Sequence, residues 1–131
     1  MEGISLDGRT YRVHVVPDTV RRVANLIEGP TNGDMLNYRH ERDLKGTKFE
    51  YELQIEPDWI NFQDYDELFS ELASPVPTHK VRLPFGQGMI EFNAIITSVS
   101  DGLIGEANGV NRWHGMTLRF LPERPQWGVD A

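Results

Sequence analysis

The clearest hydrophobic pattern in the chain is a strict alternation along residues 48–56. Phe49, Tyr51, Leu53 and Ile55 occupy every second position, and lysine, glutamate and glutamine fill the positions between them. Successive side chains of a strand point to opposite faces, so the pattern predicts a strand with one face in the core and one in water.

The same period of two returns after Pro77. Alternate side chains of residues 79–85 share one face, and a Gly-Gln-Gly turn at 86–88 leads into a second extended stretch, residues 89–100. This arrangement predicts two neighbouring strands.

An N-terminal hairpin is indicated by an Asp-Gly pair at residues 7–8. Extended residues flank the pair on both sides, at 4–6 and 9–16. A two-residue Asp-Gly turn is a strong local signal for a β-hairpin.

Residues 19–28 carry two conflicting patterns. Val20, Val23, Ala24 and Ile27 have the spacing of one helix face, whereas alternate positions from Val20 to Leu26 also suit a strand. The periodicity alone narrowly favours a helix.

One helix is well supported, at about residues 64–73. Tyr65, Leu68, Phe69 and Leu72 form an apolar stripe, and a Ser-Pro pair at 74–75 ends the helical pattern. Asp64 and Glu67 have the spacing of a capping box, which is an N-terminal signal.

The other segments read as turns, loops or a final strand. Residues 29–34 form a cluster of turn residues, and residues 35–44 are polar and extended. Residues 101–111 hold two turn dipeptides and predict a mobile loop before a last strand at 112–121. The tail at 122–131 has two prolines and no periodicity, so we expect it to lie along a partner or to fray.

Together these elements predict a single, mainly β domain over residues 1–131. We expect an antiparallel barrel or sandwich of about six or seven strands with the one helix flanking it. The predicted core consists of Phe49, Tyr51, Leu53, Ile55, Leu68, Phe69, Leu72, Val81, Leu83, Phe92 and Phe120.

Composition narrows the class of protein. The chain has a formal net charge of −7, which disfavours a surface that neutralises a phosphate backbone, so we expect no sequence-specific nucleic-acid binding. It has no cysteine, no apolar run long enough to span a membrane and no signal-peptide pattern. These features fit a cytoplasmic origin without a membrane partner.

The sequence offers no catalytic motif. It has no Gly-rich phosphate loop and no nucleophile elbow, and its four histidines are too scattered for a metal motif. We interpret the histidines as surface or interface residues. We therefore expect no catalytic residue, metal or other cofactor, and a protein that is not an enzyme.

The candidate interface residues are tryptophans beside element ends and the residues of two Asn-Gly turns. Tryptophan is enriched at protein interfaces because it buries a large rigid surface at low entropic cost. The candidates are Trp59, Asn32, Gly33, Asn108, Gly109 and Trp127.

Several short segments, in their order and spacing, resemble a family of small prophage tail-region proteins of Gram-positive bacteria. They are GPTNG at 29–33, RDLKGT at 42–47 running into YELQI at 51–55, YDEL at 65–68, PVPTH at 75–79, LPFGQG at 83–88 and NRWHG at 111–115. This family is related by fold to phage distal tail and tail-tube proteins. The resemblance favours a strand for residues 19–28, and we follow it there against the period count.

The resemblance implies a structural protein of a phage or prophage tail: a distal tail, tube or connector component. Its partners would be other tail proteins and further copies of itself in a ring, with DNA passing through the lumen. An acidic lumen would repel the DNA backbone and let it slide. The protein would be found in the bacterial cytoplasm during assembly and then in the virion tail.

Two other classes of function stay open. A small β-barrel carrier would hold an apolar ligand inside the barrel. An enzyme of unknown reaction would assemble its site from residues 101–111.

Overall fold

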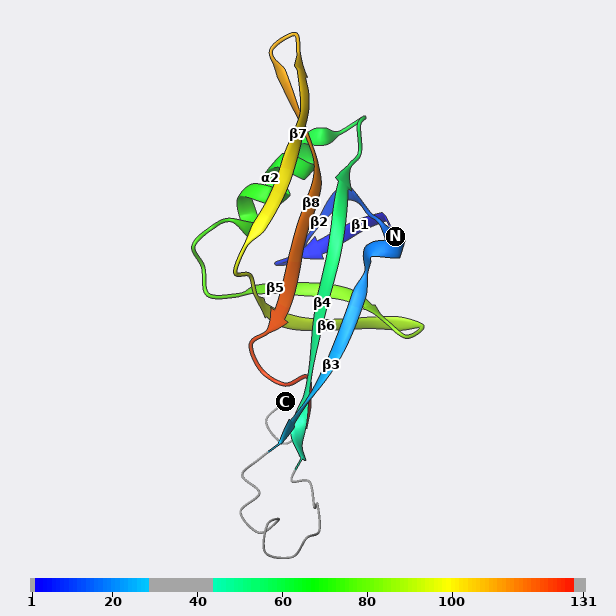
Figure 1. The fold of residues 1–131 in the computed structure, drawn as a ribbon, viewed down its shortest axis with the longest axis vertical. Helices are drawn as coiled ribbons and strands as arrows, with labels where there is room; N and C mark the ends of the chain where they lie inside the picture. The colour runs from blue at the N-terminus through cyan, green and yellow to red at the C-terminus, as the bar shows by residue number, and fades with distance from the viewer. Residues whose placement is uncertain (1, 29–43, 129–131) are drawn as a thin grey trace, which may run out of the picture.

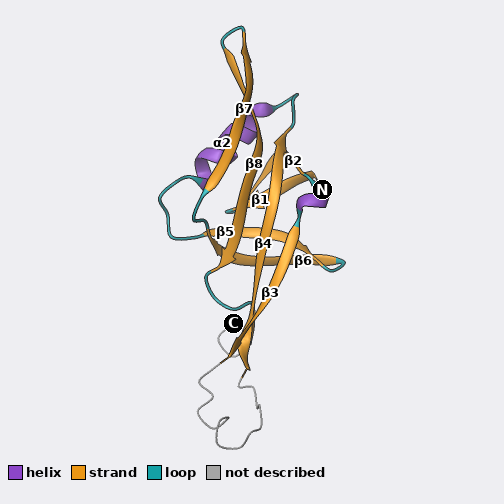
Figure 2. Ribbon diagram, viewed as in Figure 1, coloured by secondary structure: helices purple, strands orange, loops and turns teal. Residues whose placement is uncertain are grey.

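Six antiparallel strands close into a barrel, which confirms the predicted fold class (Figures 1 and 2). The computed structural model describes residues 2–28 and 44–128. The barrel strands are β1 (Glu2–Leu6), β2 (Arg9–Val15), β4 (Leu44–Pro57), β5 (His79–Phe85), β6 (Gly88–Ile95) and β8 (Val110–Pro122). Around the barrel the order is β4, β2, β1, β5, β6 and β8, and β8 pairs with β4 to close it.

Strand β4 is the central element of the fold. Its alternating pattern places Phe49, Tyr51, Leu53 and Ile55 in the core, as predicted. The C-terminal part of the strand pairs with β2 and β8, and the N-terminal part continues beyond the barrel. The other predicted core residues are also buried, except Phe69, which is partly buried against the core.

The predicted N-terminal hairpin is confirmed. Asp7 and Gly8 connect β1 to β2 with φ angles of 52° and 83°. Two consecutive positive φ angles are typical of a type I′ turn, whose twist matches that of the strands it joins.

Residues 19–28 do not form a helix. A short 3-10 turn, η1 (Pro17–Thr19), leads into strand β3 (Arg21–Glu28), which pairs antiparallel with β4 from Arg21↔Glu52 to Glu28↔Leu44. The strand interpretation is therefore confirmed and the period count was misleading. Nearly all of β3 is exposed, so no buried face imposes a period on its sequence.

The helix α2 (Phe62–Leu72) begins earlier than predicted and does not use the predicted capping box. Its N-cap is Asn61, which makes no side-chain cap hydrogen bond. Asp64 accepts a hydrogen bond from the Arg12 backbone N–H at 2.8 Å, and Glu67 pairs with Arg9. These carboxylates thus dock the helix onto β2, while Tyr65, Leu68 and Leu72 are buried.

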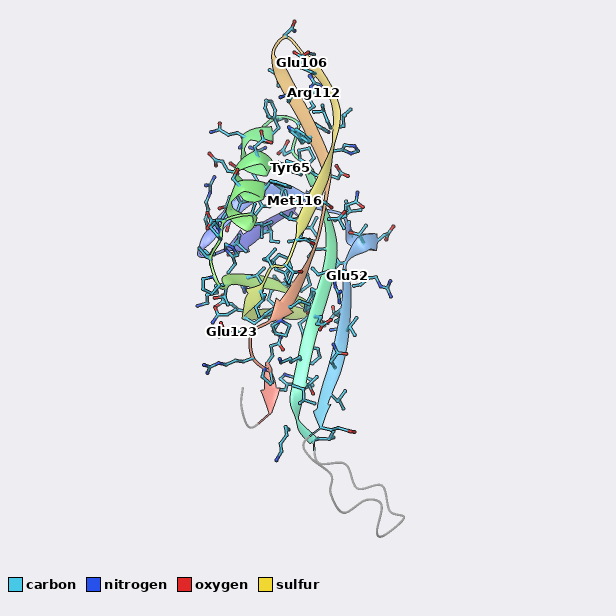
Figure 3. All side chains as sticks on the ribbon, turned by 60° about the vertical axis from the view of Figure 1, so that its left-hand side comes forward. Glu52, Tyr65, Glu106, Arg112, Met116 and Glu123 are labelled. Atoms are coloured by element: carbon cyan, nitrogen blue, oxygen red, sulfur yellow. The ribbon has the colours of Figure 1, made fainter. Side chains whose placement is uncertain are left out.

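The predicted loop at residues 101–111 is instead part of a long β-ribbon. Strand β7 (Val99–Ala107) pairs with β8 through a turn at Asn108 and Gly109, both with positive φ, so β8 begins before the predicted residue 112. The ribbon projects from one end of the barrel (Figure 1), and Glu106 and Arg112 lie far out along it (Figure 3). An exposed ribbon needs few side chains that pack against a core, so it can contain several glycines. These glycines were the reason that the sequence predicted a loop.

The C-terminal segment packs on its own chain, which corrects the expectation of a frayed or partner-bound tail for its described part. Strand β9 (Trp127–Gly128) pairs with β4 at Thr47 and Gly46. The Gln126 side chain accepts a hydrogen bond from the Phe49 N–H at 2.9 Å and donates one to the Phe49 carbonyl at 3.0 Å. Such a short strand shows no periodicity that a sequence pattern could reveal.

The predictions for residues 29–34 and for most of 35–44 lie outside the described residues.

Candidate functional site

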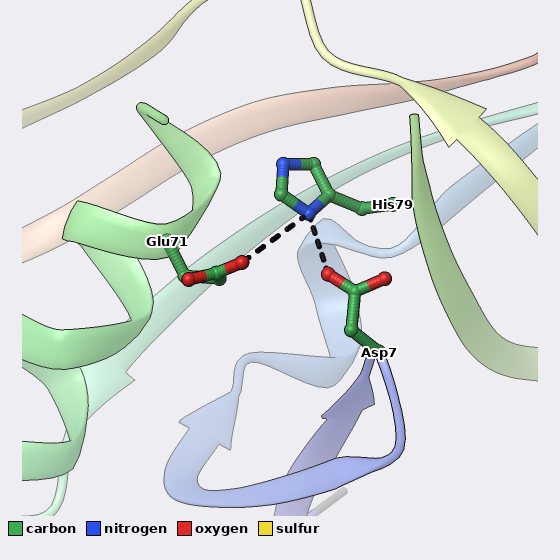
Figure 4. A group of neighbouring side chains, drawn as sticks. All are labelled: Asp7, Glu71 and His79. Atoms are coloured by element: carbon green, nitrogen blue, oxygen red, sulfur yellow. Dashed lines mark hydrogen bonds and ion pairs between the residues drawn. The ribbon is translucent and has the colours of Figure 1, made fainter. Parts of the chain in front are cut away.

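Three titratable side chains from distant parts of the chain meet at His79 (Figure 4). His79 is the first residue of β5 and is 2% exposed. Its Nδ1 lies 2.7 Å from Oδ2 of Asp7, in the β1–β2 turn, and 3.9 Å from Oε1 of Glu71, in the last turn of α2. The expectation of a surface or interface histidine is therefore wrong for His79.

The geometry of this cluster suits a structural tie better than catalysis. Asp7 uses both carboxylate oxygens, because its Oδ1 accepts a hydrogen bond from the Lys80 N–H at 2.7 Å. The Nε2 atom of His79 is buried and has no hydrogen-bond partner within the described chain. A general base must reach the proton that it abstracts, and a buried Nε2 does not reach solvent.

The same nitrogen and oxygen atoms are of the types that can coordinate a divalent cation. The histidine nitrogen and the two carboxylate oxygens lie within 4.8 Å of one another. A metal on Nδ1 would require the proton on Nε2, where His79 has no acceptor among the described residues. Metal-bound histidines normally donate that proton to a partner. The hydrogen-bonded tie between Asp7 and His79 fits these surroundings better than a metal does.

A second site is a surface pocket between α2 and the β7–β8 ribbon. Its volume is about 320 Å³, and its lining comprises Asp66, Phe69, Ser70, Asp101 and Trp113. We call it the Asp66–Asp101 pocket. Asp101 lies where the β7–β8 register shifts between Ser100 and Gly102, and such a bulge re-aims the side chain that it carries.

Uncompensated negative charge marks this pocket. Burial and the charge of Asp101 raise the pKa of Asp66. In the described part of the chain, Asp101 accepts a hydrogen bond from Tyr65 Oη at 3.1 Å, and neither aspartate forms an ion pair. By contrast, Asp64 on the same helix pairs with Arg9.

Large apolar side chains are exposed at both ends of the long axis of the molecule. On β7 Leu103 and Ile104 are 51% and 54% exposed, and on β3 and β9 Leu26 and Trp127 are 49% and 54% exposed. The β7–β8 ribbon and β3 extend toward opposite ends of the molecule (Figure 1). A contiguous exposed apolar patch is typical of a protein contact site, and these side chains are the candidates for such a patch.

The structure separates the predicted interface residues. Asn108 and Gly109 form the ribbon turn, Trp59 lies half exposed between β4 and α2, and Trp127 lies near the opposite end. Trp127 also packs edge-on against Phe49, with ring centroids 4.7 Å apart. Asn32 and Gly33 lie outside the described residues.

Sequence reasoning missed Asp7, His79 and the Asp66–Asp101 pocket. Their partners are far apart along the chain, and no spacing motif links them. The only signals were the Asp-Gly turn that contains Asp7 and the acidic character of the helix.

No protein-family model, curated protein or solved structure matches the chain. Within the described residues, no helix has the length and apolar character needed to cross a membrane.

Proposed function

We propose that this protein is a structural assembly subunit that associates through its two projecting ends. The observation that carries the proposal is the extension of β7–β8 and β3–β4 beyond the barrel, with Leu103, Ile104 and Leu26 exposed on them. Burying such side chains against a neighbouring chain removes apolar area from water, which is the dominant favourable contribution to most protein associations.

The open edge of β3 supports the same proposal. Among the described strands, β3 pairs only with β4, so from Arg21 to Ile27 its other edge has no neighbouring strand in the described part of the chain. Its register is regular from Arg21 to Ile27, and it contains no proline. A regular edge without proline or a bulge can accept a strand from another chain.

The biological setting we propose is a phage or prophage tail, on the basis of the sequence resemblance. In that setting the chain is a distal tail, tube or connector subunit, its partners are further copies and other tail proteins, and DNA passes through the ring. The net charge of −7 suits a lumen that DNA crosses without sticking. Assembly would take place in the bacterial cytoplasm and the product would be the virion tail.

The two other functions have less support from the geometry. A carrier needs space inside the barrel, and this interior is filled by core side chains such as Leu53, Leu83 and Phe120. The enzyme alternative relied on a loop at residues 101–111, which instead forms strands.

Light scattering across a concentration series tests the proposal. The molar mass of the wild type should rise above the monomer value of 15.0 kDa as concentration increases. The double variant Leu103→Ser/Ile104→Ser should remain closer to a monomer, because it removes apolar area from the ribbon. Met89→Ser is the control, since Met89 is an exposed apolar residue at the start of β6, paired with Pro84 of β5. Equal association of all three proteins would contradict the proposed surface.

A further inference from the structure

We propose that the Asp66–Asp101 pocket binds an arginine side chain of a neighbouring protein chain. This inference rests on the proposed assembly function and adds the chemistry of the contact. The site combines two carboxylates with aromatic walls from Phe69 and Trp113.

The charge of the pocket selects a cation. Two other carboxylates of α2, Asp64 and Glu67, are matched from within the chain, because Arg9 of β2 pairs with both. Asp66 shares the pocket with Asp101 instead, and burial together with repulsion by the Asp101 carboxylate disfavours the ionised form of Asp66. A cation bound between them would relieve this repulsion, whereas an anion would increase it.

The walls and the size of the pocket favour a guanidinium group. A planar guanidinium stacks on an aromatic face and donates paired hydrogen bonds to carboxylates, whereas an ammonium is a compact and strongly hydrated point charge. Trp113 is 37% exposed, so a ligand can reach its ring. The volume of about 320 Å³ is at the low end of ligand pockets and suits one side chain better than a large cofactor.

The hydrogen bond from Tyr65 holds Asp101 in position before a ligand binds. Tyr65 is 1% exposed and donates its hydroxyl hydrogen bond to Oδ2 of Asp101. This bond holds the bulged residue of β7 against α2, so the second carboxylate is already positioned when a cation arrives. Such preorganisation lowers the entropic cost of binding.

Nuclear magnetic resonance of the full chain tests the inference. The probe is a blocked Gly-Arg-Gly peptide, and the readout is the indole N–H resonance of Trp113, assigned with Trp113→Phe. The arginine peptide should shift this resonance to saturation, and the matched citrulline peptide, which lacks the charge, should not. A lysine peptide should bind more weakly than the arginine peptide.

Variants link the binding to the two carboxylates. Asp66→Asn/Asp101→Asn should weaken peptide binding by about tenfold or more, which corresponds to about 1.4 kcal/mol. Asparagine at 101 keeps an acceptor for Tyr65, so the pocket should stay folded, as peak dispersion will report. Asp18→Asn is the matched control, because Asp18 is exposed on η1, away from α2 and the ribbon.

Three results would overturn the inference. The first is that the arginine and citrulline peptides shift the Trp113 resonance equally, or that neither shifts it. The second is that the control variant Asp18→Asn weakens peptide binding as much as the double variant does. The third is that tetramethylammonium shifts the resonance as strongly as the arginine peptide. The last would indicate a site for a small-molecule cation. Loss of self-association in the ribbon variant together with no peptide binding would retain the assembly function and reject only this pocket.

Discussion

The hydroxyl of Tyr65 on α2 donates a hydrogen bond to Asp101 Oδ2 on β7 at 3.1 Å, which joins the helix to the base of the projecting ribbon. Figure 3 shows Tyr65 on the helix beside the ribbon strands. Burial and the nearby Asp101 carboxylate raise the pKa of Tyr65 well above that of a free tyrosine. The tie therefore persists over the physiological pH range.

Tyr65→Phe should lower the free energy of unfolding by about 1 kcal/mol, the typical net contribution of one hydrogen bond. It should also change the alkaline behaviour. Because the folded pKa of Tyr65 is raised, the unfolded chain loses this proton first, and wild-type stability falls as pH rises above about 10. Urea unfolding at neutral and alkaline pH should show a shallower alkaline loss in the variant. An identical pH slope in both proteins would show that Tyr65 ionises normally.

Asp7→Gly should destabilise the fold by roughly 1–3 kcal/mol, because it leaves the buried His79 Nδ1 and the Lys80 N–H without their acceptor. Glycine accepts the φ angle of 52° at this position, so backbone strain does not enter the comparison. The control is Asp7→Asn, which keeps an acceptor oxygen and tolerates a positive φ. Equal unfolding midpoints for the wild type and the glycine variant would refute the role of this tie.

Gly46→Ala should displace strand β9. A Cβ at Gly46 would collide with the carbonyl oxygen of Trp127 and would crowd the Cβ of Pro125. Overpacking of this kind costs roughly 1–3 kcal/mol. Amide exchange at Phe49 should become faster, because its N–H donates to the Gln126 side chain. Gly105→Ala is the control, since a Cβ there meets open space; similar exchange in both variants would contradict the close packing of β9.

The sequence predicts those parts of the fold where a buried face imposes a period. Phe49, Tyr51, Leu53 and Ile55 alternate because one side of β4 lines the core. The exposed strand β3 and the ribbon strand β7 have no such constraint. The residues of β3 therefore also fitted a helix, and those of β7 also fitted a loop.

The candidate sites were harder to predict from the sequence than the fold, for a different reason. His79 meets Asp7 from 72 positions away, and Tyr65 meets Asp101 from 36 positions away. Only the closure of the barrel and the docking of α2 bring these pairs together. No local pattern encodes such distances, whereas the Asp-Gly turn, which is local, was predicted correctly.

Site-specific photo-crosslinking tests the central claim most directly, because it locates the contact between chains. A benzophenone amino acid would replace Ile104 on the ribbon, Leu26 on β3, or Met89 at the start of β6, all of which are at least 45% exposed. Assembly through the two ends predicts covalent dimers from positions 104 and 26 and few from position 89. Equal yields at all three positions, or dimers from position 89 alone, would contradict the account.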